Sequence, residues 1–248
     1  MYYIDTHIHL QDYNHKDVNN VVTKAQKNNV MLFINPSSHP DDWPRISAMS
    51  AQFTQVIPAY GIHPWYIDDA AVDWEINLAE QLAKNPQAWV GECGIDTIKQ
   101  SNSKAQCAVF TKHIDIAKAY HRPLIIHSVK ANQYLSSFFS QLPQQTIFHS
   151  FTGSLEWGKE IQKHGFYLGL NFSIMRKNQA ENIIKNIDLN RVLLETDGPY
   201  QPLNKGNISL PENLPQLAQF IADIRQTSLA ELQDILYRNW LNFTGEHQ

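Results

Sequence analysis

The sequence has few cysteines, little charge and no long apolar run, and each shortage excludes a class of protein. Two cysteines, Cys93 and Cys107, in 248 residues exclude a disulfide scaffold and favour the cytoplasm. The apolar runs are far shorter than the roughly 20 residues of a membrane-spanning helix, and no basic start followed by an apolar stretch marks a signal peptide. We therefore expect a soluble, cytoplasmic protein that does not act at a membrane.

The charge balance limits the partners that the chain can bind. The net charge is −4 with histidines neutral, which argues against a large non-specific nucleic-acid surface. A local site that grips one or two phosphates remains compatible with that charge. Hydrophobic residues make up 43% of the chain, enough for a sizeable core, and no linker, low-complexity segment or charge run divides it. We expect a single domain over residues 1–248, with no obligate protein partner evident.

Apolar segments alternate regularly with segments of helical periodicity. Strands are predicted at 2–4, 30–34, 56–63, 88–92, 124–127, 146–149, 166–170 and 192–195. Helices are predicted at about 16–28, 41–52, 73–85, 103–121, 131–141, just before 165, 177–187, from 214 to 222 and from the capping box Ser228 to Glu231 onward. This alternation predicts an α/β protein with the (β/α)₈ TIM barrel fold, which typically has about 250 residues. The doubly wound open sheet is the rival, but its glycine-rich turn is missing after the first strand.

Two histidines follow the first predicted strand, in Asp5-Thr6-His7-Ile8-His9. Side chains alternate between the faces of a strand, so Asp5, His7 and His9 are expected to point the same way. Two neutral imidazoles on one face can bind the same metal ion. An isolated pair of this kind could equally be ordinary surface histidines. Whether the pair binds a metal ion therefore depends on whether other strands also end in metal ligands.

Further polar residues stand at the ends of later strands, where the active site of a (β/α)₈ barrel forms. They are His63, Glu92, His127, His149 and Asp197. Burying so many ionisable groups is costly unless metal ions compensate. The set can hold two divalent ions, with His7, His9 and Asp197 serving one, His127 and His149 the other, and Glu92 bridging. Two ions about 3.5–4 Å apart can share a hydroxide and stabilise both oxygens of an in-line displacement at phosphorus.

Several segments resemble the successive motifs of the TatD-related metal-dependent deoxyribonucleases, a family within the amidohydrolase-like barrel superfamily. They are Asp5-Thr6-His7-Ile8-His9, Gly61-Ile62-His63-Pro64-Trp65, Gly91-Glu92-Cys93-Gly94-Ile95-Asp96, Pro123-Leu124-Ile125-Ile126-His127-Ser128, His149-Ser150-Phe151-Thr152-Gly153 and Glu195-Thr196-Asp197-Gly198-Pro199-Tyr200. The resemblance runs through nearly the whole chain in the family's order.

The resemblance implies a function and a role for each motif residue. It implies that the metal ligands are His7, His9, Glu92, His127, His149 and Asp197. It also implies that His63 contacts substrate and that Asp197 positions or deprotonates the attacking water. The implied reaction is hydrolysis of DNA phosphodiester bonds by a metal-bound hydroxide, acting on DNA ends or single strands in the 3′ to 5′ direction. On chemical grounds imidazole ligands favour Zn or Mn, whereas the resemblance suggests that Mg supports turnover.

The sequence departs from the family pattern in its basic residues. Val129 stands where an arginine usually follows the fifth strand, with Lys130 next to it, and Lys205 is the base nearest to a second missing arginine. An arginine binds phosphate bidentately, whereas a lysine offers a point charge. Lys130 and Lys205 are therefore candidate substrate-binding residues. The segment 97–100 lacks the aromatic residues usual after Asp96, and Trp65 could either stack on a base or form a wall of the pocket.

Other polar residues are expected to be structural or solvated. Cys93 should face away from Glu92 by strand alternation, and Cys107 lies on the apolar face of its helix. Solvated positions are expected for His15, His39, His113, His121, His164 and His247. Two other functions stay open: the same barrel and metals acting on a small ester, amide or lactone, and a non-catalytic binding protein that inherited the fold.

Overall fold

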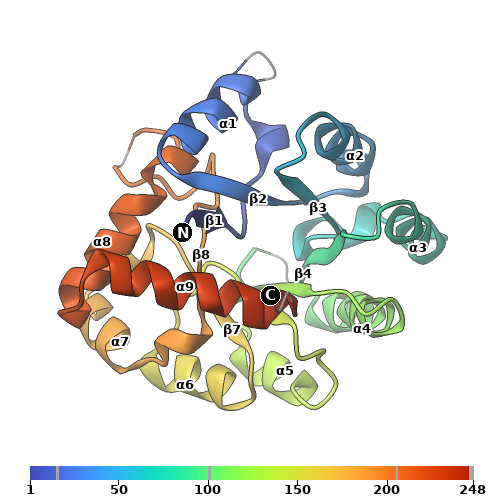
Figure 1. Ribbon diagram of the computed structural model, residues 1–248. Coiled ribbons are helices and arrows are strands. Elements are labelled where there is room, and N and C mark those ends of the chain that lie inside the picture. Colours follow the sequence, from blue (N-terminus) through green and yellow to red (C-terminus); the bar gives the residue numbers. More distant parts are fainter. Residues whose placement is uncertain (15–16, 100–101, 205, 246–248) are drawn as a thin grey trace. The chain divides into compact units, whose positions relative to one another are not determined.

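The structure, a computed structural model, describes residues 1–14, 17–99, 102–204 and 206–245 (Figure 1). Its strands follow the order β1 to β8 in one eight-stranded sheet, and helices alternate with them along the chain. This order and alternation are those of a (β/α)₈ barrel, so the predicted fold class is confirmed. Contacts group the chain into two compact units, unit 1 with residues 1–34 and 150–248, and unit 2 with residues 35–149. The single domain over 1–248 stays a prediction.

Unit 1 contains four parallel strands, although the last two residues of one of them belong to unit 2. The strands are β1 (Tyr3–Asp5), β2 (Val30–Pro36), β7 (Tyr167–Leu170) and β8 (Val192–Leu194). Asp5 of β1 pairs with Phe33, and Leu170 of β7 pairs with Leu194. The backbone N–H of Thr6 donates to the carbonyl of Leu194 at 3.0 Å, so the chain that follows β1 runs beside β8.

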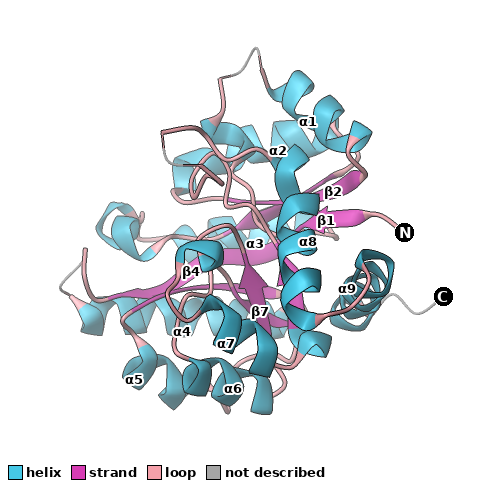
Figure 2. Cartoon of the chain, turned by 90° about the vertical axis from the view of Figure 1, so that its left-hand side faces the viewer, coloured by secondary structure: helices cyan, strands magenta, loops and turns pink. Residues whose placement is uncertain are grey.

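Among the described residues of unit 1, five α-helices accompany these strands. They are α1 (Val18–Lys27), α6 (Leu155–Lys163), α7 (Ala180–Asn186), α8 (Leu214–Arg225) and α9 (Leu229–Thr244). The apolar stripe predicted for α8 is buried, with Leu217 and Ile221 fully covered. The Oγ of Ser228 accepts the N–H of Glu231 at 3.1 Å, which is one of the two bonds of the predicted capping box, and so caps the start of α9; the Glu231 carboxylate accepts the hydroxyl of Thr227. Figure 2 shows α8 and α9 beside β1, which they contact.

Unit 2 contains the other four strands and the helices between them. The strands are β3 (Val56–Tyr60), β4 (Trp89–Asp96), β5 (Leu124–Val129) and β6 (Thr146–Phe148), and the helices are α2 (Trp43–Gln52), α3 (Trp74–Lys84), α4 (Ser103–Ala119) and α5 (Asn132–Leu135). β4 pairs in parallel with β3 and β5, and all its residues are buried. Figure 1 shows α4 beside β4, against which it packs.

Three predicted boundaries in unit 2 are wrong. β3 ends at Tyr60 instead of His63, because Pro64 begins a 3₁₀ helix and His63 is its N-cap. β4 continues four residues past Glu92, to Asp96. The helix predicted at 131–141 is the single turn α5 followed by a 3₁₀ turn, where the hydroxyls of Ser136 and Ser137 donate back to backbone carbonyls.

Within the described ranges no helix is both long and apolar enough to cross a membrane. That agrees with the shortage of apolar runs in the sequence. The cytoplasmic location stays a prediction.

Candidate metal centre and its surroundings

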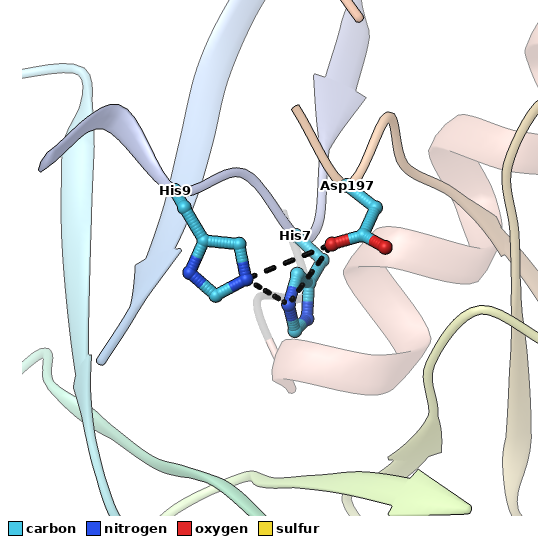
Figure 3. A group of neighbouring side chains, drawn as sticks. All are labelled: His7, His9 and Asp197. Carbon is cyan, nitrogen blue, oxygen red and sulfur yellow. Dashed lines mark hydrogen bonds and ion pairs between the residues drawn. The ribbon is translucent and has the colours of Figure 1, made fainter. Parts of the chain in front are cut away.

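Unit 1 gathers two imidazoles and one carboxylate just beyond β1 and β8 (Figure 3). The Nε2 atoms of His7 and His9 lie 3.1 Å apart, and the Oδ1 of Asp197 lies 3.9 Å from the first and 3.6 Å from the second. All three residues are buried. We call this set the unit 1 donor group. Two ring nitrogens and a carboxylate oxygen that face one another in this way can share one cation.

The backbone of unit 1 explains why these residues meet. The N–H of Asp197 donates to the carbonyl of His7 at 2.8 Å, and the N–H of His9 donates to the carbonyl of Gly198 at 2.7 Å. Asp197 has a φ of +54°, a left-handed conformation that aspartate tolerates better than most residues. Gly198 packs against the hydroxyl of Tyr13, so a side chain at position 198 would collide with it. The chain after β1 is thereby held beside the turn that carries Asp197.

Two polar residues support this group from behind. The carboxylate of Asp5 accepts the backbone N–H of Thr196 at 2.9 Å and its hydroxyl at 2.6 Å, which ties β1 to the chain after β8. Burial raises the pKa of Asp5 to about 8, although these hydrogen bonds lower it. The side-chain amide of Gln11 contacts His9 Nδ1 at 3.2 Å. The atom next to His9 Nδ1 is the Gln11 amide nitrogen. With the amide turned over by half a turn, its oxygen would accept a proton from Nδ1 and leave His9 Nε2 open for a metal ion.

Unit 2 gathers three imidazoles around one carboxylate. The Oε1 of Glu92 lies 2.7 Å from both His127 Nδ1 and His149 Nε2, and 3.6 Å from His63 Nε2. His63 Nε2 and His127 Nδ1 are 3.1 Å apart. We call these four residues the unit 2 donor group. His63, for which a substrate contact is predicted, therefore belongs by position to the set that could hold an ion.

The approach of His63 to Glu92 depends on a small residue and a buried histidine. Gly61 lies so close to the backbone of Gly91 and Glu92 that an added Cβ would overlap it. Next to it, the N–H of Ile62 donates to His113 Nε2 at 3.1 Å, and the ring of His113 stacks on Trp74. The prediction that His113 is solvated is wrong, because the side chain is fully buried in α4. Burial lowers its pKa to about 4 despite its bond to the carbonyl of Val109.

Asp96, at the end of β4, stands behind His127. Its Oδ2 lies 3.5 Å from His127 Nε2, on the side of the ring opposite to Glu92. Burial would lower the pKa of His127, but Asp96 and Glu92 outweigh it and raise the pKa above its usual value. Burial would likewise raise the pKa of Asp96, yet His127, Trp65 and two backbone N–H groups hold it well below its usual range. Carboxylates that favour a protonated imidazole also favour a cation bound to it.

The other predicted residues have different surroundings. Trp65 is half-buried, and its indole N–H donates to Asp96 Oδ2 at 2.7 Å. Lys130 is exposed after β5, with a φ of +53°. Lys205 lies outside the described residues. Cys93 is buried, with its Sγ directed to the carbonyl of Ile125, in agreement with its predicted core position.

Sequence reasoning missed the supporting residues Gln11, Asp96 and His113. A signal existed for Asp96, because it follows Glu92 by four residues and alternation places both on one face of an extended strand. Gln11, two residues after His9, carried no comparable signal, because it lies in a 3₁₀ turn where strand alternation has ended.

Both donor groups suit a transition metal. In each of two sets, His7 with His9 and Asp197, and His63 with Glu92 and His127, one ligand atom per residue lies within 4.8 Å of the others. Imidazole nitrogens and carboxylate oxygens together suit Zn or Mn, and carboxylates also suit Mg. The residues present therefore fit the predicted dependence on divalent ions.

Comparisons with known proteins agree with this fold and chemistry. The sequence is 26% identical to deoxyribonuclease TATDN3 of Homo sapiens, over 96% of this chain and 93% of that protein. It is 26% identical to an uncharacterized metal-dependent hydrolase of Methanocaldococcus jannaschii, over 97% and 96% of the two chains. The crystal structure of the TatD homolog YjjV from Escherichia coli superposes with a TM-score of 0.90 at 25% identity, covering 97% of each chain.

These features define a metal-dependent hydrolase built on a (β/α)₈ barrel. Residues 4–245 match the family described as TatD related DNase, and the chain belongs to that family.

Proposed function

We propose that the protein hydrolyses phosphodiester bonds of DNA, removing nucleotides from 3′ ends or single strands with two divalent ions. The observation that carries the proposal is that each unit has a donor group of imidazoles and carboxylate, buried except for the partly covered His127, in a chain of the TatD related DNase family. The name deoxyribonuclease, borne by a relative at 26% identity, supports the same substrate.

The chemistry of each side chain indicates its role in the proposed reaction. His7, His9 and Asp197 would hold one ion, and Glu92, His127 and His149 the other, as the ligand pattern of the family implies. Divalent ions in such a site act as Lewis acids and lower the pKa of water. Asp197, at 8% exposure the least covered of the unit 1 donors, positions the attacking water or accepts its proton. His63 contacts the phosphate or the leaving oxygen. That Glu92 bridges both ions stays a prediction, and we assign Glu92 here to the unit 2 ion, because its Oε1 lies 2.7 Å from two imidazole nitrogens of that unit.

A second candidate is hydrolysis of a small ester, amide or lactone by the same groups. The observation that favours it is the poor supply of cations for a nucleic acid, with a net charge of −4 and Val129 at the place of an arginine. A small neutral substrate would not need cationic side chains for binding.

One experiment separates the two. The purified protein is loaded with Mg²⁺, Mn²⁺ or Zn²⁺ and given a 5′-labelled single-stranded oligonucleotide, the same strand with a blocked 3′ end, and a panel of esters, amides and lactones. We expect a ladder of shortened products from the open strand and none from the blocked one. Hydrolysis of a panel member, with both oligonucleotides intact, would replace the proposed function with the second. A His9→Gln variant purified in parallel controls for contaminating nucleases.

A further inference from the structure

An exposed lysine rests on Trp65, beside the unit 2 donor group. The Nζ of Lys99 lies 3.4 Å from the centroid of the Trp65 ring, a cation–π contact. Lys99 itself is exposed, and in the part of the chain that the structure describes it forms no ion pair with a carboxylate. Its charge is therefore held in place by a ring and remains available to an anion from solvent.

Asp96 builds the support under this lysine. Its Oδ2 accepts the indole N–H of Trp65 at 2.7 Å, which fixes the plane of the ring. Its Oδ1 accepts the backbone N–H groups of Ile98 and Lys99 at 2.8 and 3.0 Å, which fixes the turn from which the lysine extends. Gln106 adds a further constraint, because its amide bonds both the N–H and the carbonyl of Asp96. One buried carboxylate thus orients both partners of the cation–π contact.

The same support adjoins the unit 2 donor group. The Trp65 ring meets the ring of His63 edge-on, with centroids 4.6 Å apart, and Asp96 Oδ2 lies 3.5 Å from His127 Nε2. One aromatic ring therefore separates the Lys99 ammonium from the residues that would hold an ion. A phosphate bound to that ion would lie within the field of a second, fixed positive charge.

We propose that Lys99, held on Trp65 by Asp96, binds a phosphate of the substrate and sets the preference of this site for phosphoesters. This inference rests on the proposed function and deepens it. On this proposal Trp65 supports the lysine instead of stacking on a base at the face of the ring that Lys99 covers. Lysine offers a point charge, so we expect recognition of one phosphate without selection of the base.

Binding to single-stranded DNA tests the proposal without turnover. Fluorescence anisotropy in EDTA gives the Kd of a labelled oligo-dT at several salt concentrations, for wild type, Lys99→Ala, Lys99→Arg and Lys118→Ala. Lys118 is exposed near the end of α4 and serves as the matched control, because its loss changes the net charge equally. Each phosphate contact on a single strand contributes about −0.7 to the slope of log K against log salt.

We expect Lys99→Ala to weaken binding and to reduce that slope by about 0.7, the value of one phosphate contact. Lys99→Arg should keep the wild-type slope, since it keeps the charge and the cation–π contact, and Lys118→Ala should match wild type. The proposal would be overturned if Lys99→Ala and Lys118→Ala reduced the slope of log K against log salt equally, or if neither changed it. It would also be overturned if the wild type did not bind the strand.

The failure of the proposed function has a different signature. In that case metal-loaded wild type would leave the open oligonucleotide intact with every ion tested. If wild type cleaves the strand while Lys99→Ala retains its Kd and slope, only the role of Lys99 is wrong.

Discussion

The two donor groups differ in how far the protein alone has assembled them. In unit 2 the Glu92 carboxylate lies 2.7 Å from two imidazole nitrogens, so hydrogen bonds within the group can hold it together before an ion arrives. In unit 1 the Asp197 carboxylate stands 3.6 and 3.9 Å from the histidine nitrogens, beyond hydrogen-bond distance. There the two imidazoles contact each other at 3.1 Å, and backbone bonds between the chain after β1 and the turn of Asp197 place the carboxylate beside them. A central carboxylate bonded to two imidazoles organises the unit 2 group, whereas backbone pairing positions the carboxylate of the unit 1 group.

This comparison predicts different responses to mutation. A change to Glu92 removes the central carboxylate of its donor group. Changes to the residues behind the ligands of either group should lower the affinity for an ion without abolishing its site.

Replacing Glu92 by glutamine should have the largest effect. The substitution keeps the size of the side chain and removes the charge that balances a cation in the unit 2 donor group. We expect turnover to fall well beyond the roughly 10–100-fold typical of residues behind the ligands, with the ion of unit 1 retained. Steady-state rates and metal analysis check both points. A near-normal rate with full metal content would show that Glu92 is not a ligand, and the melting temperature in chelator controls for folding.

His113 should make stability depend on pH. Its pKa is about 4 in the folded protein and about 6.5 when unfolded, so below pH 6.5 the unfolded chain takes up a proton that the folded protein does not. Its neutral state therefore contributes stability that is fully present above pH 6.5 and lost as the pH falls toward 4. The loss should approach about 3 kcal/mol, since one pKa unit corresponds to about 1.36 kcal/mol.

His113→Gln provides the control for this effect. Glutamine can accept the N–H of Ile62 but does not titrate, so its free energy of unfolding should fall less steeply between pH 6.5 and 4. Urea unfolding of both proteins in EDTA measures the difference. Parallel pH profiles would show that His113 does not carry the dependence.

Replacing Asp96 by asparagine should weaken metal binding to unit 2 alone. The carboxylate behind His127 favours a positive charge on that ring, and its loss should reduce affinity about 10–100-fold. Isothermal titration with Zn²⁺ resolves the change. Affinity lost equally at both sites would mean that the substitution acts through general destabilisation.

The smallest effect is expected for Gln11→Leu in unit 1. The substitution removes the contact with His9 Nδ1, so the affinity of the unit 1 ion should fall by about tenfold, near the lower limit for such residues. The same titration measures this loss of affinity. Gln162→Leu in α6 would be an unsuitable control, because the amide of Gln162 bonds three backbone groups. Gln219 in α8, an exposed residue of unit 1 that donates to Asp223, controls for the same substitution away from the donor group. An affinity equal to that of Gln219→Leu would remove Gln11 from the account.

The sequence predicted the fold class, and the polar residues that it singled out at strand ends include all members of both donor groups, because strand alternation and strand ends are local properties of the chain. Their roles as metal ligands stay predictions, and His63 was expected to contact substrate instead. The sequence reading ended β4 at Glu92, because a charged residue is rarely found inside a buried strand. Glu92 is tolerated there because its carboxylate contacts the imidazole of His127 on β5 and that of His149, the residue after β6. His113 was misjudged because its partner, the N–H of Ile62, lies 51 residues away. Lys99 could not be assigned, since its position depends on hydrogen bonds between Trp65 and Asp96, 31 residues apart.

The central claim is that each unit holds an ion of its own, and metal counting tests it most directly. Native mass spectrometry of the protein saturated with Zn²⁺ or Mn²⁺ should show two ions per chain in wild type. One ion should remain in Glu92→Gln and one in His9→Gln, because each substitution disables a different group. A wild type that saturates with a single ion, or a single substitution that removes both ions from a folded protein, would contradict the claim.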